Sequence, residues 1–232
     1  MRVQQLDVFI YDADGLQELE SWQHFDGLRD TVRVKGAKRA KTVVAIANSP
    51  RSFNRKAIER YDSIELLNYD FEEDSPEQPI MGGICSLGYE RPGTVTLEPL
   101  FSKVVLCEVS NLMKAYVRME DPRIYLQNIN ESAEVLRKSG FRASEGGTVG
   151  KKYKLPYDIG VFPQQLNFEL LCYPNDSAEA TMGTPRTSLV LECEISGETC
   201  RFTVELPEVG RNRKINVDIS VSGPQLFESK VY

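Results

Sequence analysis

The chain has 232 residues, 41% of them hydrophobic, which is enough to bury the core of one large domain or of two smaller ones. Its 28 basic and 34 acidic residues leave a net charge of -6 and form no basic block, so nucleic acid is not an expected partner. No run of about 18 apolar residues occurs, so the sequence predicts no membrane-spanning helix.

The first third of the chain predicts two strands and a helical segment. Residues 6–11 alternate in polarity and run into an Asp-rich turn, which predicts a strand. The polar segment that follows contains His24 and is interpreted as a loop. Residues 42–50 are small and mostly apolar, which predicts a core strand buried on both faces. Between residues 54 and 69 apolar side chains recur at helical spacing, which predicts one or two short helices.

The middle of the chain predicts further strands and one more helix. Residues 74–83 are acidic and rich in proline and glycine, which is typical of a loop. Residues 94–111 read as two strands separated by a proline, and another strand is expected near residues 124–128. A brief helix is predicted at about residues 131–139, before a glycine that would end it.

A change in composition marks the expected domain boundary. Residues 142–165 are rich in glycine and proline, contain two lysine pairs and lack periodicity. We therefore expect an N-terminal domain over residues 1–153 and a C-terminal domain over residues 154–232.

The strongest local pattern is a hairpin at residues 187–207. Two alternating runs meet at Ser196 and Gly197, a pair typical of a two-residue primed turn. That turn sets a register in which Cys193 lies opposite Cys200. The same register pairs Ile195 with Glu198, Leu191 with Phe202, and Leu189 with Val204. One face of each run is apolar, as in a half-buried antiparallel pair.

Two further segments of the C-terminal half alternate in the same way. They are residues 166–172 and residues 215–221. The chain is therefore predicted to be mainly β, with two tandem β-sandwich domains and short helices in the first only.

The cysteines do not indicate a disulfide framework. There are five, none in a Cys-x-x-Cys pair, and most lie in apolar strand runs. Cys193 and Cys200 are close enough in the predicted register for a disulfide. We interpret them as reduced core thiols, with a disulfide as the alternative.

Candidate catalytic groups are few. His24 is the only histidine, and no Gly-x-Ser-x-Gly sequence occurs. Residues 145–152, EGGTVGKK, imitate a phosphate-binding loop. The motif, however, needs Gly where Glu145 stands and Ser or Thr where Lys152 stands. We expect no enzyme activity, no catalytic residue and no cofactor.

Two acidic stretches are candidate calcium ligands. They are residues 11–15 and residues 71–77, in which carboxylates recur at short spacing. Neither has the full spacing of a calcium-binding loop, and aspartate is common in turns for its own hydrogen bonding. We interpret both as solvated turns and expect no metal site.

Six segments, in order, resemble the fimbrillin-A-associated anchor proteins of Bacteroidetes fimbriae. No single segment is specific, but the order of all six is. They are LDVFIYDADG, TVVAIANSP, DSPEQPIMGG, the strands and helix from residue 94 to 141, LLCYPND with the hairpin, and GRNRKINVDISVSG.

The resemblance implies a fold, a function and partners. The fold would be two transthyretin-like β-sandwiches, and the function that of an adhesive fimbrial (pilus) subunit of anchor or accessory type. Such subunits are exported through the periplasm as lipoproteins and placed on the cell outer membrane. They assemble by strand complementation, in which an incomplete sheet accepts a donor strand from another fimbrial subunit.

The sequence departs from the family at its N-terminus. The lipoprotein signal, its cysteine and the apolar strand expected before residue 6 are missing from it. Trimming of the chain or proteolytic processing would each explain this. In either case the strand beside residues 6–11 would be vacant.

Three short strings resemble the O-glycosylation signal of exported Bacteroidetes proteins. They begin at Asp30, Asp62 and Asp176. Ser177, in an expected loop, is the main candidate for modification.

A second function remains open, that of a cell-surface carbohydrate-binding protein. β-Sandwiches can bind a glycan through exposed aromatic side chains, and Trp22, Tyr61 and Tyr89 are candidates. A row of exposed aromatics would favour this function, whereas an unpaired apolar sheet edge would favour assembly.

Overall fold

The computed structural model describes residues 2–33, 39–88, 91–114, 116–143, 147–177 and 184–232. The described chain is mainly β, with one short helix, α1 (Tyr61–Glu65), and one 3-10 turn, η1 (Phe71–Glu73). It divides into two compact units. Unit 1 comprises residues 1–100 and 132–138, and unit 2 comprises residues 101–131 and 139–232.

This division differs from the boundary predicted at residue 153. The predicted boundary places strands β7 (Ser102–Asn111) and β8 (Glu120–Ile129) in the first domain, whereas both belong to unit 2. The reason is long-range pairing, because β7 pairs with strands near residues 164 and 214, and β8 with the hairpin strand at 188. Glycine and proline content reports chain irregularity, and here the irregular segment lies within unit 2.

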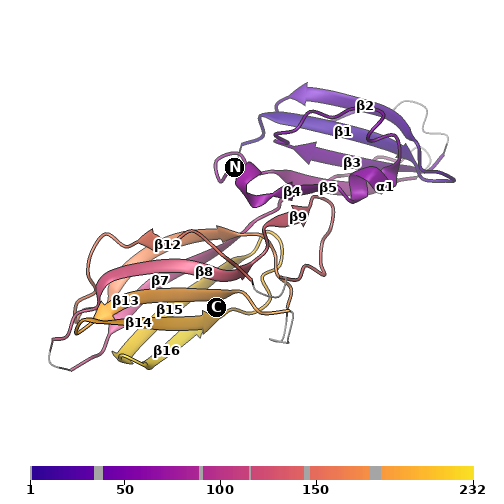
Figure 1. The fold of residues 1–232 in the computed structure, drawn as a ribbon. Helices are drawn as coiled ribbons and strands as arrows, with labels where there is room; N and C mark the ends of the chain where they lie inside the picture. The colour runs from indigo at the N-terminus through magenta and orange to yellow at the C-terminus, as the bar shows by residue number, and fades with distance from the viewer. Residues whose placement is uncertain (1, 34–38, 89–90, 115, 144–146, 178–183) are drawn as a thin grey trace. The chain divides into compact units, whose positions relative to one another are not determined.

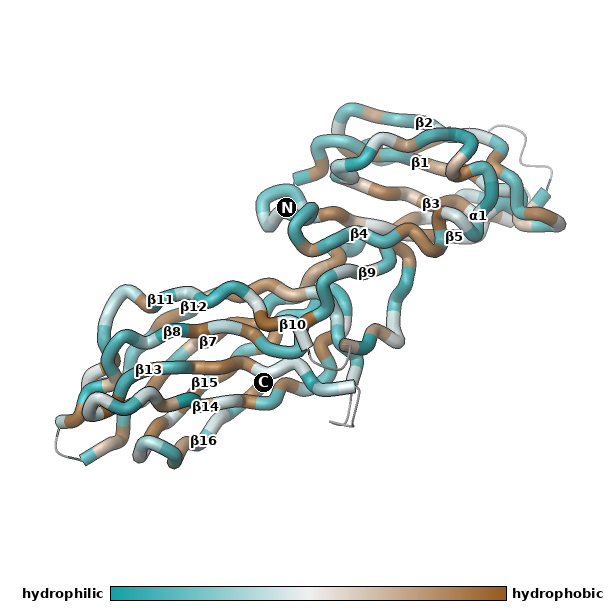
Figure 2. Tube along the Cα trace, in the orientation of Figure 1, coloured by the Kyte–Doolittle hydropathy of each residue, from teal (hydrophilic) through white to brown (hydrophobic). Residues whose placement is uncertain are grey.

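Unit 1 contains a five-stranded sheet in the order β2-β1-β3-β5-β6 (Figure 1). These strands are β1 (Gln5–Asp12), β2 (Leu19–Asp26), β3 (Lys41–Ala47), β5 (Met81–Leu87) and β6 (Glu98–Pro99). Figure 2 shows hydrophobic stretches along β3 and β5. Strand β3 is buried on both faces, as its composition predicts, whereas the strand β5 was not predicted and the expected loop before it ends at Met81.

The two faces of this sheet are covered differently. Phe9 packs edge-on against Phe53, with ring centroids 4.9 Å apart, and the Tyr11 hydroxyl donates to the carbonyl of Ile58 (3.0 Å). The opposite face carries a second apolar cluster, against which side chains from the flanking loops pack. Its buried members are Leu6, Val8, Ile10, Val43, Ala45, Ala47 and Met81.

A two-stranded sheet replaces the helix predicted near residues 131–139. Strand β9 (Ser132–Glu134) pairs with β4 (Asn68–Asp70), so that Ala133 lies opposite Tyr69. The prediction was wrong because pairing with a strand more than sixty residues earlier overrides the local helical preference. The expected helices between residues 54 and 69 reduce to α1 and a hydrogen-bonded turn before it.

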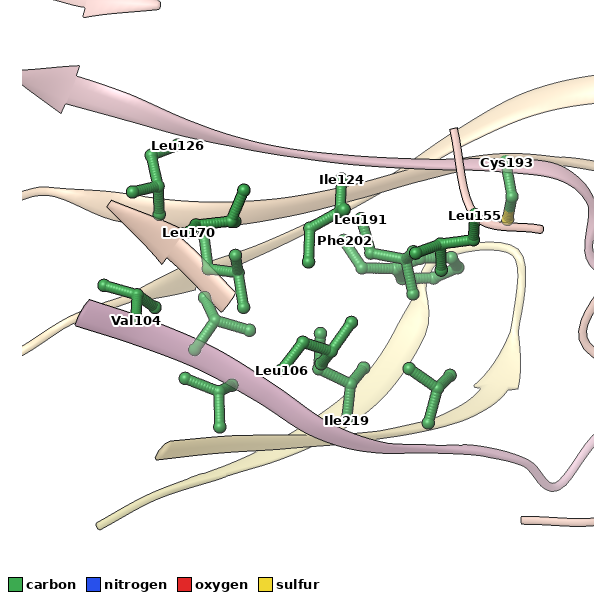
Figure 3. Packing of buried hydrophobic residues seen from close by; sticks show 14 of the residues in the cluster. Val104, Leu106, Ile124, Leu126, Leu155, Leu170, Leu191, Cys193, Phe202 and Ile219 are labelled. Carbon is green, nitrogen blue, oxygen red and sulfur yellow. The ribbon is translucent and has the colours of Figure 1, made fainter. Parts of the chain in front are cut away.

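Unit 2 is a β-sandwich of two sheets. One contains β10 (Thr148–Val149) and β11 (Tyr153–Lys154), both on β8, then β13 (Ser188–Ile195) and β14 (Glu198–Glu205). The other has the order β12 (Gln164–Cys172), β7, β15 (Lys214–Gly223), β16 (Leu226–Val231). Figure 3 shows the core between them, where Ile124, Leu191 and Phe202 meet Leu106 and Ile219.

The hairpin has the predicted register. Cys193 lies opposite Cys200, and the other three predicted pairs are also present. Ser196 and Gly197 both have positive φ, 53° and 82°, as a type I′ turn requires. Strand β16 was not predicted, because charged and polar residues follow one another along its exposed outer part.

Candidate functional site

The candidate site for assembly is the outer edge of β2 in unit 1. The outermost strands of the sheets, which lack a second strand partner among the described residues, include β2, β12, β14 and β16. Such an edge presents unpaired backbone N–H and C=O groups to which another chain can add a strand. The four edges differ in how they are protected, and that difference selects β2.

Strands β12, β14 and β16 carry features that discourage strand addition. β12 contains a register shift between Gln165 and Phe168, where Asn167 has a φ of 48°. β14 alternates buried apolar with exposed polar or charged residues, so its apolar side chains are already covered by the core. β16 presents Glu228 and Lys230 to solvent.

Strand β2 carries fewer of these features, although its pairing with β1 shifts register between Ile10 and Tyr11 and it exposes the carboxylates of Glu20 and Asp26. Its pairing with β1 is regular from Gln5 opposite Asp26 to Ile10 opposite Ser21, and it contains no lysine and no proline. Its start is held by a neighbouring segment, since Leu19 N donates to the carbonyl of Glu59. From Glu20 onward the described residues leave the outer edge without a strand partner.

A buried carboxylate fixes β2 to β1. Asp7 is 3% exposed, and its Oδ1 accepts hydrogen bonds from Trp22 Nε1 (2.8 Å) and, with the appropriate tautomer, His24 Nδ1 (2.9 Å). The two donors compensate the desolvation of the carboxylate. His24 therefore lies on a strand and not in the predicted loop.

Apolar side chains lie on both faces of this edge. Trp22 stacks on Phe9 with ring centroids 6.1 Å apart, and Phe25 packs against the loop-covered apolar cluster of unit 1. Both are only partly buried, so each has ring surface left for an added strand to cover.

The vacancy expected beside residues 6–11 is absent. β1 is paired over its length with β2 on one side and with β3 on the other. The expectation was wrong in its location, because the strand beside β1 is β2, which forms from the polar segment predicted to be a loop. A donor strand would have to add elsewhere in the sheet.

The aromatic residues proposed for sugar binding fall in different places. Trp22 is on β2, and Tyr89 lies outside the described residues. Tyr61 lines an open hollow of about 280 Å³ in unit 1, together with Glu65, Leu66, Ile84, Glu134, Leu136 and Arg137. Burial, and then the neighbouring Glu65 carboxylate, raise the pKa of Tyr61. The hollow combines an aromatic ring with charged groups, which is a composition that sugars can bind.

Ser177 is 7% exposed, and its hydroxyl has no hydrogen-bond partner among the described residues. A transferase acting on folded unit 2 would find this hydroxyl covered, so glycosylation of Ser177 stays a prediction that requires modification before folding. Thr31 and Ser63 lie in exposed parts of unit 1.

Residues of both acidic stretches, and Lys152 of the string EGGTVGKK, make contacts with nearby groups, whereas residues 145 and 146 of that string lie outside the described residues. Glu73 forms an ion pair with Arg51, and Asp12 Oδ1 accepts from Asp14 N (3.3 Å). Lys152 binds the carboxylate of Glu192 on β13 at 3.2 Å and stacks over the Tyr125 ring. Among the described residues no group of His, Cys, Asp and Glu is arranged to hold a metal ion.

All five cysteines are free, including Cys193 and Cys200, which face each other across the hairpin. Burial, followed by the nearby Cys200, raises the pKa of Cys193 to about 12. A thiol this hard to ionise is a packing group and not a nucleophile.

No helix in the described part of the chain is long and apolar enough to span a membrane. No family model matches the chain, and no curated protein matches it. Its fold is nevertheless found in several solved structures of low sequence identity.

One is a proposed cell adhesion protein from Parabacteroides distasonis, with a TM-score of 0.72 and 12% identity over 99% of this chain and 87% of that chain. Another is a proposed cell adhesion protein from Bacteroides eggerthii, with a TM-score of 0.68 and 12% identity over 100% of this chain and 88% of that one. A third is a fimbrial assembly protein from Parabacteroides distasonis, with a TM-score of 0.58 and 14% identity over 99% and 86%. These similarities establish a shared fold.

Proposed function

We propose that this protein is a cell-surface fimbrial subunit of anchor or accessory type that serves adhesion and assembles by accepting a donor strand along β2. The observation that carries the proposal is the outer edge of β2, which pairs regularly with β1 from Asp26 to Ser21 and has partly buried aromatic residues on both faces. A shared fold with proteins described as acting in adhesion and fimbrial assembly supports it. The role is structural and not enzymatic.

The physical basis is strand addition to a preformed sheet. The unpaired backbone groups of β2 would supply hydrogen bonds, and the exposed parts of Trp22 and Phe25 would be covered by alternate side chains of the donor. The Asp7 hydrogen bonds hold β2 in place, so β2 would already be ordered before the donor binds and binding would cost less entropy.

The test uses Trp22, which is the only tryptophan of the chain. Fluorescently labelled synthetic peptides with alternating apolar residues are titrated while the anisotropy of the label, which reports binding, and the Trp22 emission are recorded. We expect a blue shift on binding, and its loss when the apolar residues of the peptide are replaced by aspartate. A Gln23→Lys variant should reduce binding, because a lysine at the edge discourages strand addition.

The matched control is Thr203→Lys, which places the same charge on the edge strand β14. This variant should bind the peptide as the unmodified protein does. Equal binding by both variants with unchanged Trp22 emission would place the acceptor edge elsewhere, and loss of binding in Thr203→Lys alone would assign it to β14.

We also propose that an N-terminal lipid anchors the protein in the outer membrane after export through the periplasm. The transthyretin-like organisation of both units belongs to the same proposal. Labelling of the full-length protein in its native cells with a fatty acid, followed by membrane fractionation, tests the anchor. Recovery of the protein in the soluble fraction without the fatty-acid label would contradict the anchor.

Carbohydrate binding is the second candidate, supported by the hollow beside Tyr61. A glycan array identifies any ligand, and Tyr61→Ala should abolish a hit that depends on this hollow. Retention of the hit by Tyr61→Ala, or absence of any hit, would remove the hollow from consideration.

A further inference from the structure

One end of unit 2 carries an exposed apolar surface that the proposed assembly edge does not use. Its five large side chains are between 61% and 84% exposed and come from three segments, namely two connections and the start of β16. We call them the loop-end patch. They are Leu112 (61%), Tyr116 (84%), Tyr157 (76%), Phe162 (79%) and Leu226 (66%).

Strand pairing places these segments at one end of the sandwich. The segment after β7 and the segment before β12 run together, because Met119 and Ile159 exchange backbone hydrogen bonds of 3.0 Å in both directions. The Asn111 side chain donates to the carbonyls of Val117 (2.8 Å) and Ile159 (3.3 Å). Two of the three segments are thus tied to each other by ordered bonds.

The third segment, the β15–β16 turn, joins them through β7. Leu112 N donates to the carbonyl of Val221 (2.7 Å), and Val221 pairs with Phe227 beside Leu226. The chain passes between the units before β7, after β8 and before β10, which are all at the opposite end of the sandwich.

The backbone of Tyr116 has an unusual conformation. Its φ is 54°, a left-handed conformation that is unfavourable for a bulky side chain. Residues held in such conformations cluster at functional sites. Here the strained residue is the most exposed of the five.

The exposed area of the loop-end patch is large enough for contact with another protein. Three aromatic side chains of ~200 Å² each, about four-fifths exposed, amount to roughly 500 Å². With the two leucines the surface approaches the ~800 Å² that each partner contributes to a standard interface. One sugar ring would cover only a small part of it.

The surrounding charges favour a partner that carries both signs. Arg118 and Glu120 are exposed and make no ion pair with another described residue. Glu120 lies directly opposite Glu194 across β8 and β13, and two like charges so placed destabilise the pair. A cation from a partner would relieve this repulsion, and an anion would neutralise Lys114 and Arg118.

We propose that the loop-end patch binds the same patch of a second copy of this chain about a two-fold axis. In such an isologous contact the apolar patch of one copy packs on the same patch of the other. The basic groups of each copy would then lie near the acidic groups of the other. An anionic lipid surface fits less well, because Glu120 and Asp158 would oppose it. The inference is independent of strand addition at β2.

The test measures mass against concentration by sedimentation velocity. We expect the protein to approach twice its monomer mass as concentration rises, with weaker pairing at high salt. A Tyr116→Asn, Phe162→Ser double variant should raise the dissociation constant at least about 100-fold, since two central aromatic contacts are removed. Asparagine is chosen at residue 116 because it tolerates the left-handed backbone.

Tyr232→Ser is the matched control. Tyr232 is 56% exposed, lies in the same unit, and is held by hydrogen bonds to Asn216 near the other end of β15. This variant should pair normally, and the double variant should retain its unfolding midpoint and its Trp22 response to donor peptides. A protein that stays monomeric up to about 1 mM would overturn the proposal. Binding to anionic vesicles that the double variant loses would instead assign the patch to lipid.

Discussion

Strands β2 and β14 are both outer strands of their sheets, but their own units cover them to different degrees. On β14 the inward residues Cys200, Phe202 and Val204 are buried in the sandwich core, and the outward residues are exposed and mostly polar or charged. On β2 the rings of Trp22 and Phe25 are only partly covered. Both strands thus leave backbone groups unpaired, but only β2 also leaves apolar side chains partly exposed. An added strand would therefore bury further apolar surface on β2 and little on β14.

The largest expected effect comes from removing a side chain that completes β14. Phe202→Ala should lower the free energy of unfolding by about 3–5 kcal/mol, because a fully buried ring leaves a cavity in the core. Phe25→Ala on β2 should cost about 1 kcal/mol, since that ring is already partly hydrated. Urea unfolding of both variants measures the difference. Equal losses would mean that β2 is as complete as β14.

The next effect concerns the attachment of β2. Asp7→Asn removes the buried carboxylate that accepts from Trp22 and His24, and should cost about 1–3 kcal/mol. Trp22 emission should move to longer wavelength as the ring gains water. Asp218→Asn, on a different strand in unit 2, is the comparison variant and should leave the Trp22 emission unchanged. An unaltered spectrum in Asp7→Asn would show that the negative charge of Asp7 is not needed to hold the strand, because the amide oxygen of asparagine can still accept from Trp22.

A smaller effect is expected in the pH dependence of stability, through Glu192 on the hairpin strand β13. Burial raises the pKa of Glu192, but hydrogen bonds from Lys152 and Arg201 outweigh it, so the pKa lies below its usual range. A lowered carboxyl pKa stabilises the fold above the unfolded value of about 4.3, and this stabilisation is lost as the pH falls through the folded pKa. Glu192→Gln should flatten this acid-side loss, as measured by unfolding midpoints between pH 6 and 3. An unchanged slope would show that other carboxylates dominate.

The last prediction concerns the order in which the cysteine thiols are alkylated and involves no change in stability. Cys193 and Cys172 are buried, and burial raises the pKa of each to about 12, so both should resist alkylation at pH 8 until the protein unfolds. Cys85 and Cys107 are partly exposed and should be modified first. Mass spectrometry after timed alkylation gives the order. Early modification of Cys193 would indicate that the hairpin opens readily.

Local patterns were sufficient for strands with a clear alternating or apolar pattern. The hairpin register follows from two alternating runs and a Ser-Gly turn, because a two-residue turn leaves one antiparallel alignment in which both apolar faces agree. Strands β1, β3, β12 and β15 were likewise predicted from alternation or apolar runs. The mainly β class of the protein rests on these elements.

The candidate site was only partly accessible to such reasoning. Strand complementation was expected, but beside β1, where β2 and β3 already lie. The segment WQHFDG showed little alternation, since an edge strand with partly exposed residues on both faces has no clean polar face. A signal was available in the pairing of Asp7 with His24, but it requires the alignment of β1 with β2 to be known.

The sequence by itself determined that this chain is mainly β, and how the hairpin from residue 187 to 207 is aligned. The tertiary structure alone decided which strands share a unit, that residues 132–134 form a strand on β4, and which edge is left incomplete. The reason is that alternation specifies a face for each side chain but not a neighbour for each strand. Neighbours far apart in sequence are chosen by the burial that the whole unit achieves, which no local window contains.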